Sequence, residues 1–190
     1  MRPRDIEAAF PLLAQHGFAI TSPASGHYNC IAWAARDTAR WWWPDPSYFW
    51  PPGVPRRLTL ASFMQAYASV GFVTCQDGSL EPGYEKIAIY VDNLGSPKHA
   101  ARQLPFGRWT SKLGKHEDIK HHVDGLNGRN YGHVAQFMKR PQTSPLARAV
   151  SWLAHLWLRW TTLLAFLRPA GQPSFERVER LQRRDRTLYR

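Results

Sequence analysis

The chain has 190 residues, of which 44% are hydrophobic and 21% charged, a composition that excludes a disordered chain and suits one domain with an appendage. Its net charge of +11 is concentrated in residues 140–190, which carry ten arginines against three acids, so nucleic-acid binding by the folded part is not expected. Cys30 and Cys75 are too few for a disulfide framework, and the first residues lack the apolar run of a signal peptide, which together predict a cytoplasmic protein.

The first half of the chain has helical patterns around a proline-rich loop. Three segments show the apolar spacing of helices: 4–16, 29–39 and 59–70. Pro11 kinks or restarts the first helix, and Gly71 ends the third. The segment 41–55, WWWPDPSYFWPPGVP, contains five prolines and cannot be regular secondary structure. We expect it to lie flat on the domain, with at least two of its four tryptophans buried.

The second half of the chain favours β-structure. Four segments have the composition or position of strands: EKIAIYVD (85–92), KHAARQL (98–104), GRWTSKL (107–113) and YGHVAQFMKR (131–140). Helices first and strands later are typical of an α+β domain. We therefore predict that residues 1–140 form one α+β domain, with N-terminal helices packed on an antiparallel sheet.

Residues 141–190 have a different character. The segment 146–168 is apolar nearly all round, apart from one narrow stripe of polar residues: Arg148, Ser151, His155, Arg159 and Thr162. Two arginines and a histidine argue against an ordinary transmembrane span. We expect an appended amphipathic helix that lies on a membrane surface or packs on a partner protein, followed by a basic tail.

Cys30 is the candidate nucleophile. A helix N-terminus supplies unpaired N–H groups and a partial positive charge, which lower the pKa of a thiol and favour the nucleophilic thiolate. The backbone N–H of Cys30 could also stabilise an oxyanion during acyl transfer. The segment CIAWAA is equally typical of a core helix, because free cysteine is among the most buried residue types. The sequence leaves both interpretations of Cys30 open.

A catalytic thiol also needs a base and a group that orients the base. His99 is the best candidate for the base, because it begins a strand beside the buried segment 86–92. Ser111 has the better expected position for the orienting group, on the strand that follows His99. Asp118 has the better chemistry, since a carboxylate stabilises an imidazolium. Both remain candidates.

The blocks YNCIAWA, EKIAIYVD, KHAARQL and GRWTSKLG resemble those of a bacterial domain family of unknown function, over about residues 1–140. The order of cysteine, histidine and polar residue is similar to that of papain-like cysteine peptidases of the bacterial cell-wall amidase type. This resemblance implies a papain-like plan, with Cys30 as nucleophile, His99 as base and Ser111 or Asp118 as orienting group. The papain-like oxyanion glutamine has no counterpart in residues 21–29, where His27 and Asn29 are the candidates to replace it.

We therefore expect a cysteine-dependent hydrolase that cleaves an amide or peptide bond and needs no cofactor. The main alternative is a non-enzymatic binding module with a tryptophan-lined groove, attached to a membrane or a partner through residues 146–168. The candidate substrate-binding residues are Asn29, Trp43, Trp50, Trp109 and Lys112. The segment 115–125, KHEDIKHHVDG, contains three histidines but no cysteine, and it favours a solvated polar loop over a metal site.

Overall fold

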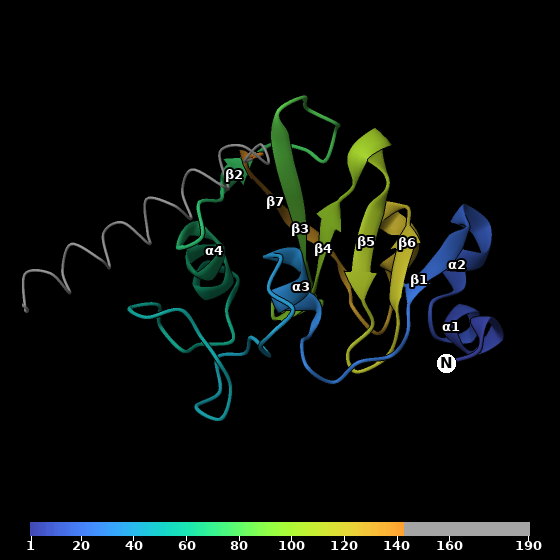
Figure 1. Ribbon diagram of the computed structural model, residues 1–190, viewed down its shortest axis with the longest axis horizontal. Coiled ribbons are helices and arrows are strands. Elements are labelled where there is room, and N and C mark those ends of the chain that lie inside the picture. Colours follow the sequence, from blue (N-terminus) through green and yellow to red (C-terminus); the bar gives the residue numbers. More distant parts are fainter. Residues whose placement is uncertain (143–190) are drawn as a thin grey trace, which may run out of the picture. The chain divides into compact units, whose positions relative to one another are not determined.

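The computed structural model describes residues 1–142, and the helix expected at 146–168 lies outside the described residues (Figure 1). The described helices are α1 (Pro3–Ala9), α2 (Pro11–His16), α3 (Cys30–Ala34) and α4 (Leu60–Ala68), with the short 3-10 helices η1 (Pro105–Gly107) and η2 (Val123–Leu126). The described strands are β1 (Phe18–Ser22), β2 (Val73–Cys75), β3 (Tyr84–Val91), β4 (Pro97–Gln103), β5 (Trp109–Lys112), β6 (Asp118–His121) and β7 (His133–Pro141).

One antiparallel sheet of seven strands dominates residues 1–142, in the order β1-β6-β5-β4-β3-β7-β2. The expected papain-like α+β plan, with N-terminal helices packed on a sheet, was therefore wrong. Even the longest of the four described α-helices has only nine residues. The physical reason lies in the helix-breaking residues: Pro11 separates α1 from α2, and the proline-rich segment 41–55 follows α3 closely. The four strands predicted from the sequence are confirmed as β3, β4, β5 and β7.

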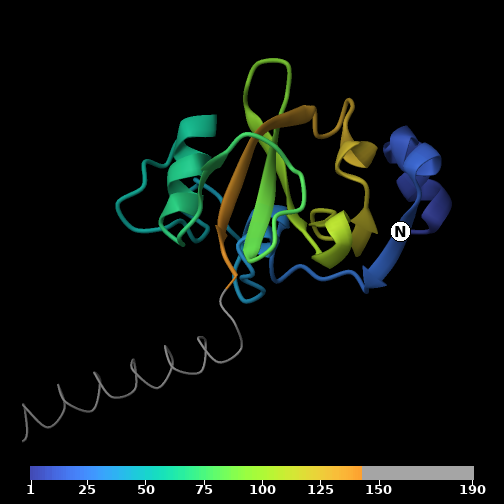
Figure 2. The same cartoon turned by 90° about the horizontal axis from the view of Figure 1, so that it is seen from above.

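Each face of the sheet carries its own hydrophobic core. Residues paired across an antiparallel ladder point to the same face, so the register assigns side chains to faces. The first core joins α3, α4 and the proline-rich segment to sheet residues that include Ile87 and Ala100. The second core joins α1, α2 and η2 to sheet residues that include Tyr90 and Trp109. Figures 1 and 2 show α4 and the α1–α2 pair at opposite ends of the sheet.

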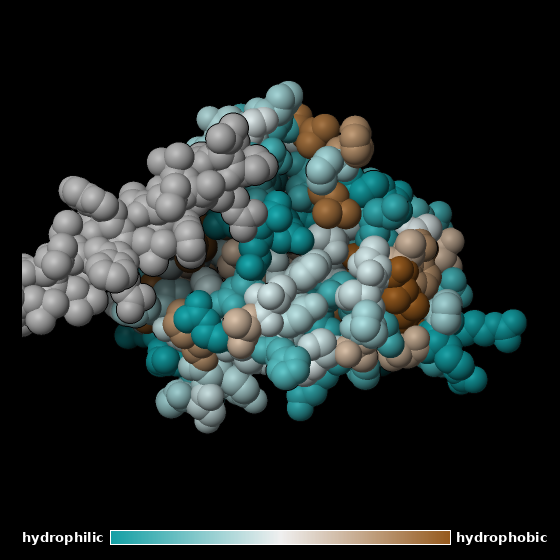
Figure 3. Space-filling model, in the orientation of Figure 1, coloured by the Kyte–Doolittle hydropathy of each residue, from teal (hydrophilic) through white to brown (hydrophobic). Residues whose placement is uncertain are grey.

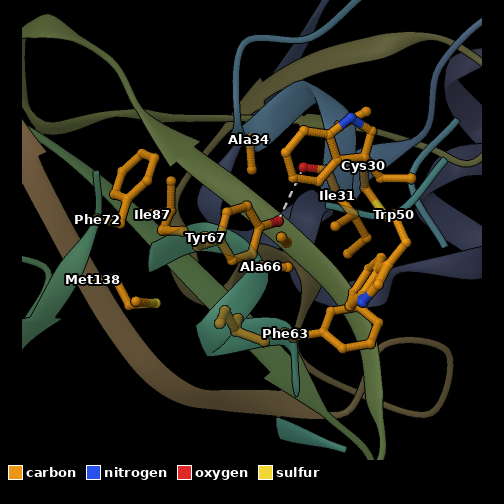
Figure 4. Packing of buried hydrophobic residues seen from close by; sticks show 14 residues of the cluster. Cys30, Ile31, Ala34, Trp50, Phe63, Ala66, Tyr67, Phe72, Ile87 and Met138 are labelled. Carbon is orange, nitrogen blue, oxygen red and sulfur yellow. Dashed lines mark hydrogen bonds between the residues drawn. The ribbon is translucent and has the colours of Figure 1, made fainter. Parts of the chain in front are cut away.

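The first core connects α3 firmly to α4. Figure 4 shows Tyr67 of α4 directed at α3, where its hydroxyl donates to the carbonyl of Ile31 at 3.0 Å. Tyr67, Ile31 and Phe63 are all fully buried. Burial of side chains of this size stabilises a fold by about 1.5–3 kcal/mol each. The packing therefore fixes the position of α3, and with it the position of Cys30.

The proline-rich segment is fixed to the domain as expected. Trp42 and Trp50 are 2% and 4% exposed, which confirms the prediction that at least two of the four tryptophans are buried. Asn29 fixes the backbone of Trp42, because its side-chain amide donates to the Trp42 carbonyl at 2.7 Å. The indole of Trp42 donates to the carboxylate of Asp37 at 2.8 Å. The loop therefore lies flat on the first core, beside the start of α3.

The surface of the described residues is mixed in character. In Figure 3 hydrophilic and hydrophobic residues are interspersed over the visible face. No helix within residues 1–142 is long and apolar enough to cross a membrane.

Candidate functional site

Cys30 lies at the edge of a pocket of about 300 Å³. The pocket is lined by Asn29, Cys30, Trp41, Trp43, Tyr48, Lys98, Gly114 and Tyr131. Asn29 is the N-cap of α3, and its side chain accepts a hydrogen bond from the backbone N–H of Ala32 at 3.1 Å. Four aromatic side chains thus lie around one thiol, at the first residue of a short helix.

The pocket contains only part of the predicted substrate-binding set. Asn29 and Trp43 line it, as expected. Trp50 and Trp109 are buried in the first and the second core respectively, and they are not among the lining residues. Trp41 also lines the pocket and was not predicted from the sequence, although it lies in the same proline-rich segment as Trp43. Its position beside two further tryptophans gave no signal that distinguished it from them.

The thiol of Cys30 is buried and protonated at neutral pH. Burial raises its pKa to about 11, although hydrogen bonds from the backbone N–H groups of Ala100, Ile31 and Cys30 and the charge of Lys112 favour the thiolate. A pKa lowered by the helix N-terminus was expected from the sequence. The effect of burial outweighs that of the helix, since α3 has only five residues and the side chain is 6% exposed.

Strands β4 and β5 are unpaired over the part of the sheet that lies beside Cys30. Strands β4 and β5 pair only at Arg102–Thr110 and at Gln103–Trp109. Continued pairing would place Ala100 opposite Lys112, but the ladder has ended before that point. The N–H of Ala100 can therefore donate to the thiol of Cys30.

His99 lies on the other face of the sheet from Cys30. It pairs with Tyr90 of the second core, whereas its neighbour Ala100 belongs to the first core together with Cys30. The His99 ring stacks on Tyr131 at 4.0 Å between centroids and is fully buried. Neither of its nitrogens has a hydrogen-bond partner within the described part of the chain. Burial holds its pKa well below the usual value, with a further contribution from nearby His121, so the imidazole is neutral.

The two candidate orienting residues contact other groups than His99. Ser111 shares the second-core face, and its hydroxyl hydrogen-bonds to Nε2 of His121 at 2.8 Å. Asp118 shares a ladder pair with Lys112, and its Oδ2 accepts hydrogen bonds from Ser22 and from the hydroxyl of Tyr28. The predicted set is thus divided: Cys30, Lys112 and Asp118 lie on the α3 face, and His99 and Ser111 lie on the other.

Lys112 is buried rather than presented to a ligand. It is fully buried, its Nζ donates to the carbonyl of His116, and the distance from Nζ to Oδ1 of Asp118 is 4.0 Å. The ring of Tyr28 covers it, with the ring centroid 5.2 Å from Nζ. Its role is therefore electrostatic, because its positive charge acts on the thiol of Cys30 from inside the protein.

His121 is a polar core residue, although a solvated loop was predicted for its segment. That expectation was wrong, since residues 118–121 form strand β6 and the His121 side chain is fully buried. Its Nδ1 lies 2.6 Å from the carbonyl oxygen of His122, and burial lowers its pKa to about 4. In the described residues, no three histidine, cysteine or acidic side chains are grouped so that they could hold a metal ion.

Fold and site together define a sheet-dominated domain with a buried thiol at an aromatic pocket. The family described as Domain of unknown function (DUF7689) matches residues 19–139, from β1 to β7, and the chain belongs to this family. The expected membership of an uncharacterised family is thereby confirmed, while the match gives no support to a papain-like relationship. Searches of curated proteins and of solved structures gave no match.

Proposed function

We propose that this domain is a cysteine-dependent hydrolase of an amide or peptide bond, with Cys30 as the nucleophile. The observation that carries the proposal is the position of this thiol, at the first residue of α3 and in the lining of an aromatic pocket, where backbone N–H groups favour its thiolate. When the sulfur attacks a carbonyl carbon, the carbonyl oxygen gains negative charge, and N–H donors at this point stabilise it. The amine then leaves with a proton, and water hydrolyses the thioester to regenerate the thiol.

His99 is the proposed base. Its imidazole is neutral and its nitrogens are free of partners among residues 1–142, so a lone pair is available for the thiol proton once the ring has left its buried site. A buried polar group without partners is rare in folded proteins and is often tied to function. His99 is also the direct neighbour of Ala100, whose backbone N–H favours the thiolate of Cys30. In this proposal the ring turns toward the opening between β4 and β5 when substrate binds, since catalytic hydrogen bonds often form only in the complex.

Tyr131 links the pocket to this movement. It lines the pocket beside Cys30, and its ring covers the ring of His99. A ligand that displaces Tyr131 would therefore also release His99. In the free domain burial keeps the thiol protonated, and the base reaches it only when the pocket is filled.

The proposal is tested with p-nitrophenyl acetate and a panel of dipeptide p-nitroanilides. We expect wild type to release p-nitrophenol or p-nitroaniline, and to carry an acetyl group on Cys30 in mass spectra after rapid quenching. Cys30→Ala and His99→Phe should both lose turnover, while the matched control Cys75→Ser should keep it. Turnover by Cys30→Ala equal to that of wild type would refute the nucleophile, and retained turnover by His99→Phe would refute the base.

A non-enzymatic binding module is the second candidate. The position of His99 on the opposite face from Cys30, together with the raised pKa of the thiol, favours this alternative. It predicts that Cys30→Ser keeps ligand binding, whereas Trp43→Ala abolishes it. Attachment to a membrane or a partner through residues 146–168 lies outside the described residues and stays a prediction.

A further inference from the structure

Two arginines pair with a single buried carboxylate on the α3 face of the sheet, and a third arginine lies on the same face. Glu85 of β3 is 5% exposed. Its Oε2 accepts a hydrogen bond from Nε of Arg36 at 2.7 Å, and its Oε1 accepts one from Nη2 of Arg140 at 3.2 Å. Both carboxylate oxygens are thus occupied by guanidinium groups.

Arg102 is the third arginine of this cluster, and Glu85 forms its ion pairs with the other two. Arg102 pairs with Ile87 in the ladder, so it lies on the same face as Glu85, diagonally across two strands. The residue is 8% exposed, and its Nε is buried without a hydrogen-bond partner in the described part of the chain. Its guanidinium lies over the indole of Trp33, at 4.7 Å from the ring centroid. Three guanidinium groups and one carboxylate leave a local charge of about +2.

The backbone of Arg36 has an unfavourable conformation in the arrangement that brings its side chain to Glu85. Helix α3 ends in a Schellman motif, in which the N–H of Asp37 donates to the carbonyl of Ala32 at 2.9 Å and the N–H of Arg36 donates to that of Trp33 at 3.0 Å. Arg36 holds the left-handed position of this motif, with φ 66°, where glycine is the usual residue. An arginine at this position places a further positive charge beside Glu85.

We propose that Arg102, with Arg36 and Arg140, binds an oxyanion, the carboxylate or phosphate group of a small ligand. The guanidinium of Arg102 offers a planar set of donors that matches two oxygens of such a group. An anion would give the buried Nε a partner and offset the excess positive charge. The site lies beyond the C-terminal end of α3, whereas Cys30 is at the N-terminal end, so the site does not depend on the proposed hydrolysis.

The test is thermal unfolding of the full chain in titrations with sodium phosphate and, separately, sodium acetate, at constant ionic strength set with sodium chloride. Wild type should show a saturable rise in Tm, about 3–6 °C at ten times the apparent Kd. Arg102→Met keeps the side-chain stem over Trp33 but removes the charge, and it should show no rise. Arg129→Met, a change of an exposed arginine elsewhere, should respond as wild type does.

The response to each anion shows whether the ligand carries a phosphate or a carboxylate group. A rise with phosphate alone supports a phosphorylated ligand, and a rise with acetate alone supports a carboxylate. Absence of a saturable rise in wild type would overturn the proposal. An equal rise in Arg102→Met would also overturn it, because general salting-out by phosphate then explains the shift. If Arg102→Met fails to fold, Arg102→Lys replaces it: this variant keeps the charge but loses the fork of donors, and at least a tenfold weaker response is required.

Discussion

Replacing His99 with phenylalanine should stabilise the folded protein while it abolishes hydrolysis. Each buried nitrogen without a partner costs about 1–3 kcal/mol, and phenylalanine removes both. The new ring keeps the stack on Tyr131 and the edge contact with Tyr90. The slightly larger ring offsets part of the gain, since overpacking costs about 1–3 kcal/mol. We expect a net gain of about 1–3 kcal/mol in the free energy of unfolding at pH 8.

The gain should grow as the pH falls. The pKa of His99 is lowered in the folded state, so below about 6.5 the unfolded chain takes up a proton that the folded protein does not. The wild type therefore loses stability as the pH falls below 6.5. At pH 5 the limiting loss is about 2 kcal/mol, reached when folded His99 takes up no proton at all. The phenylalanine variant is free of this loss, so its advantage should widen by up to about 2 kcal/mol between pH 8 and pH 5.

Urea unfolding followed by tryptophan fluorescence at both pH values measures the two differences. The wild-type protein and the variant need the same slope against urea for the comparison to hold. A variant that is less stable than wild type at pH 8, with an unchanged slope, would refute the reasoning. That result would mean that the nitrogens of His99 have partners in the folded protein, and the base role would lose its main support.

Three further outcomes follow from the structure. Iodoacetamide should label Cys30 about a hundredfold more slowly than an unperturbed cysteine at pH 7.5, because the pKa of Cys30 is about 11 rather than 9.0. The labelling rate should rise about tenfold per pH unit, and rapid labelling of the folded protein at pH 7.5 would contradict this prediction. Ser111→Ala leaves Nε2 of His121 without its partner, so the urea midpoint should fall by the equivalent of about 1–3 kcal/mol. Gly132→Ala should lower the free energy of unfolding by about 3 kcal/mol or more, since the φ of Gly132 is 76° and a Cβ would overlap the carbonyl oxygen of Val91. An unchanged Tm would show that the backbone at Val91 is farther from Gly132 than described.

The long strands could be predicted from the sequence, and the short ones could not. The segment that forms β3 is a run of β-forming apolar residues, and β4 and β5 follow it across turns. Strand β1 has five residues and β6 has four, and β1 forms a ladder only with the distant β6, which also pairs with its neighbour β5. No local pattern carries that information, because the pairing is set by tertiary packing. These additional strands, together with the short helices between prolines, are why the predicted fold class was wrong.

The candidate site was predictable in its residues but not in its geometry. The position of Cys30 at the start of a helix followed from the local pattern, and Asn29 and Trp43 were found with it. The face on which His99 lies depends on strand register, and a shift of one residue moves a side chain to the opposite face. The position of Cys30 at the start of a helix likewise predicts a lowered pKa for its thiol. The burial that raises this pKa comes from packing with α4 and the proline-rich segment, and only the fold brings these segments together.

The position of β7 has a consequence for how the domain is made. This strand is the last of the seven along the chain, yet it lies inside the sheet, between β3 and β2. Until β7 has been synthesised, β3 has one unpaired edge, and β2 has no partner in the sheet. An apolar strand with a free edge can pair with another chain, so the nascent protein is exposed to aggregation during this interval. Pairing of β1 with β6, from Phe18 to His121, adds a second contact over most of the domain, and such long-range closure slows folding. We therefore expect refolding to be slow and its yield to fall as protein concentration rises.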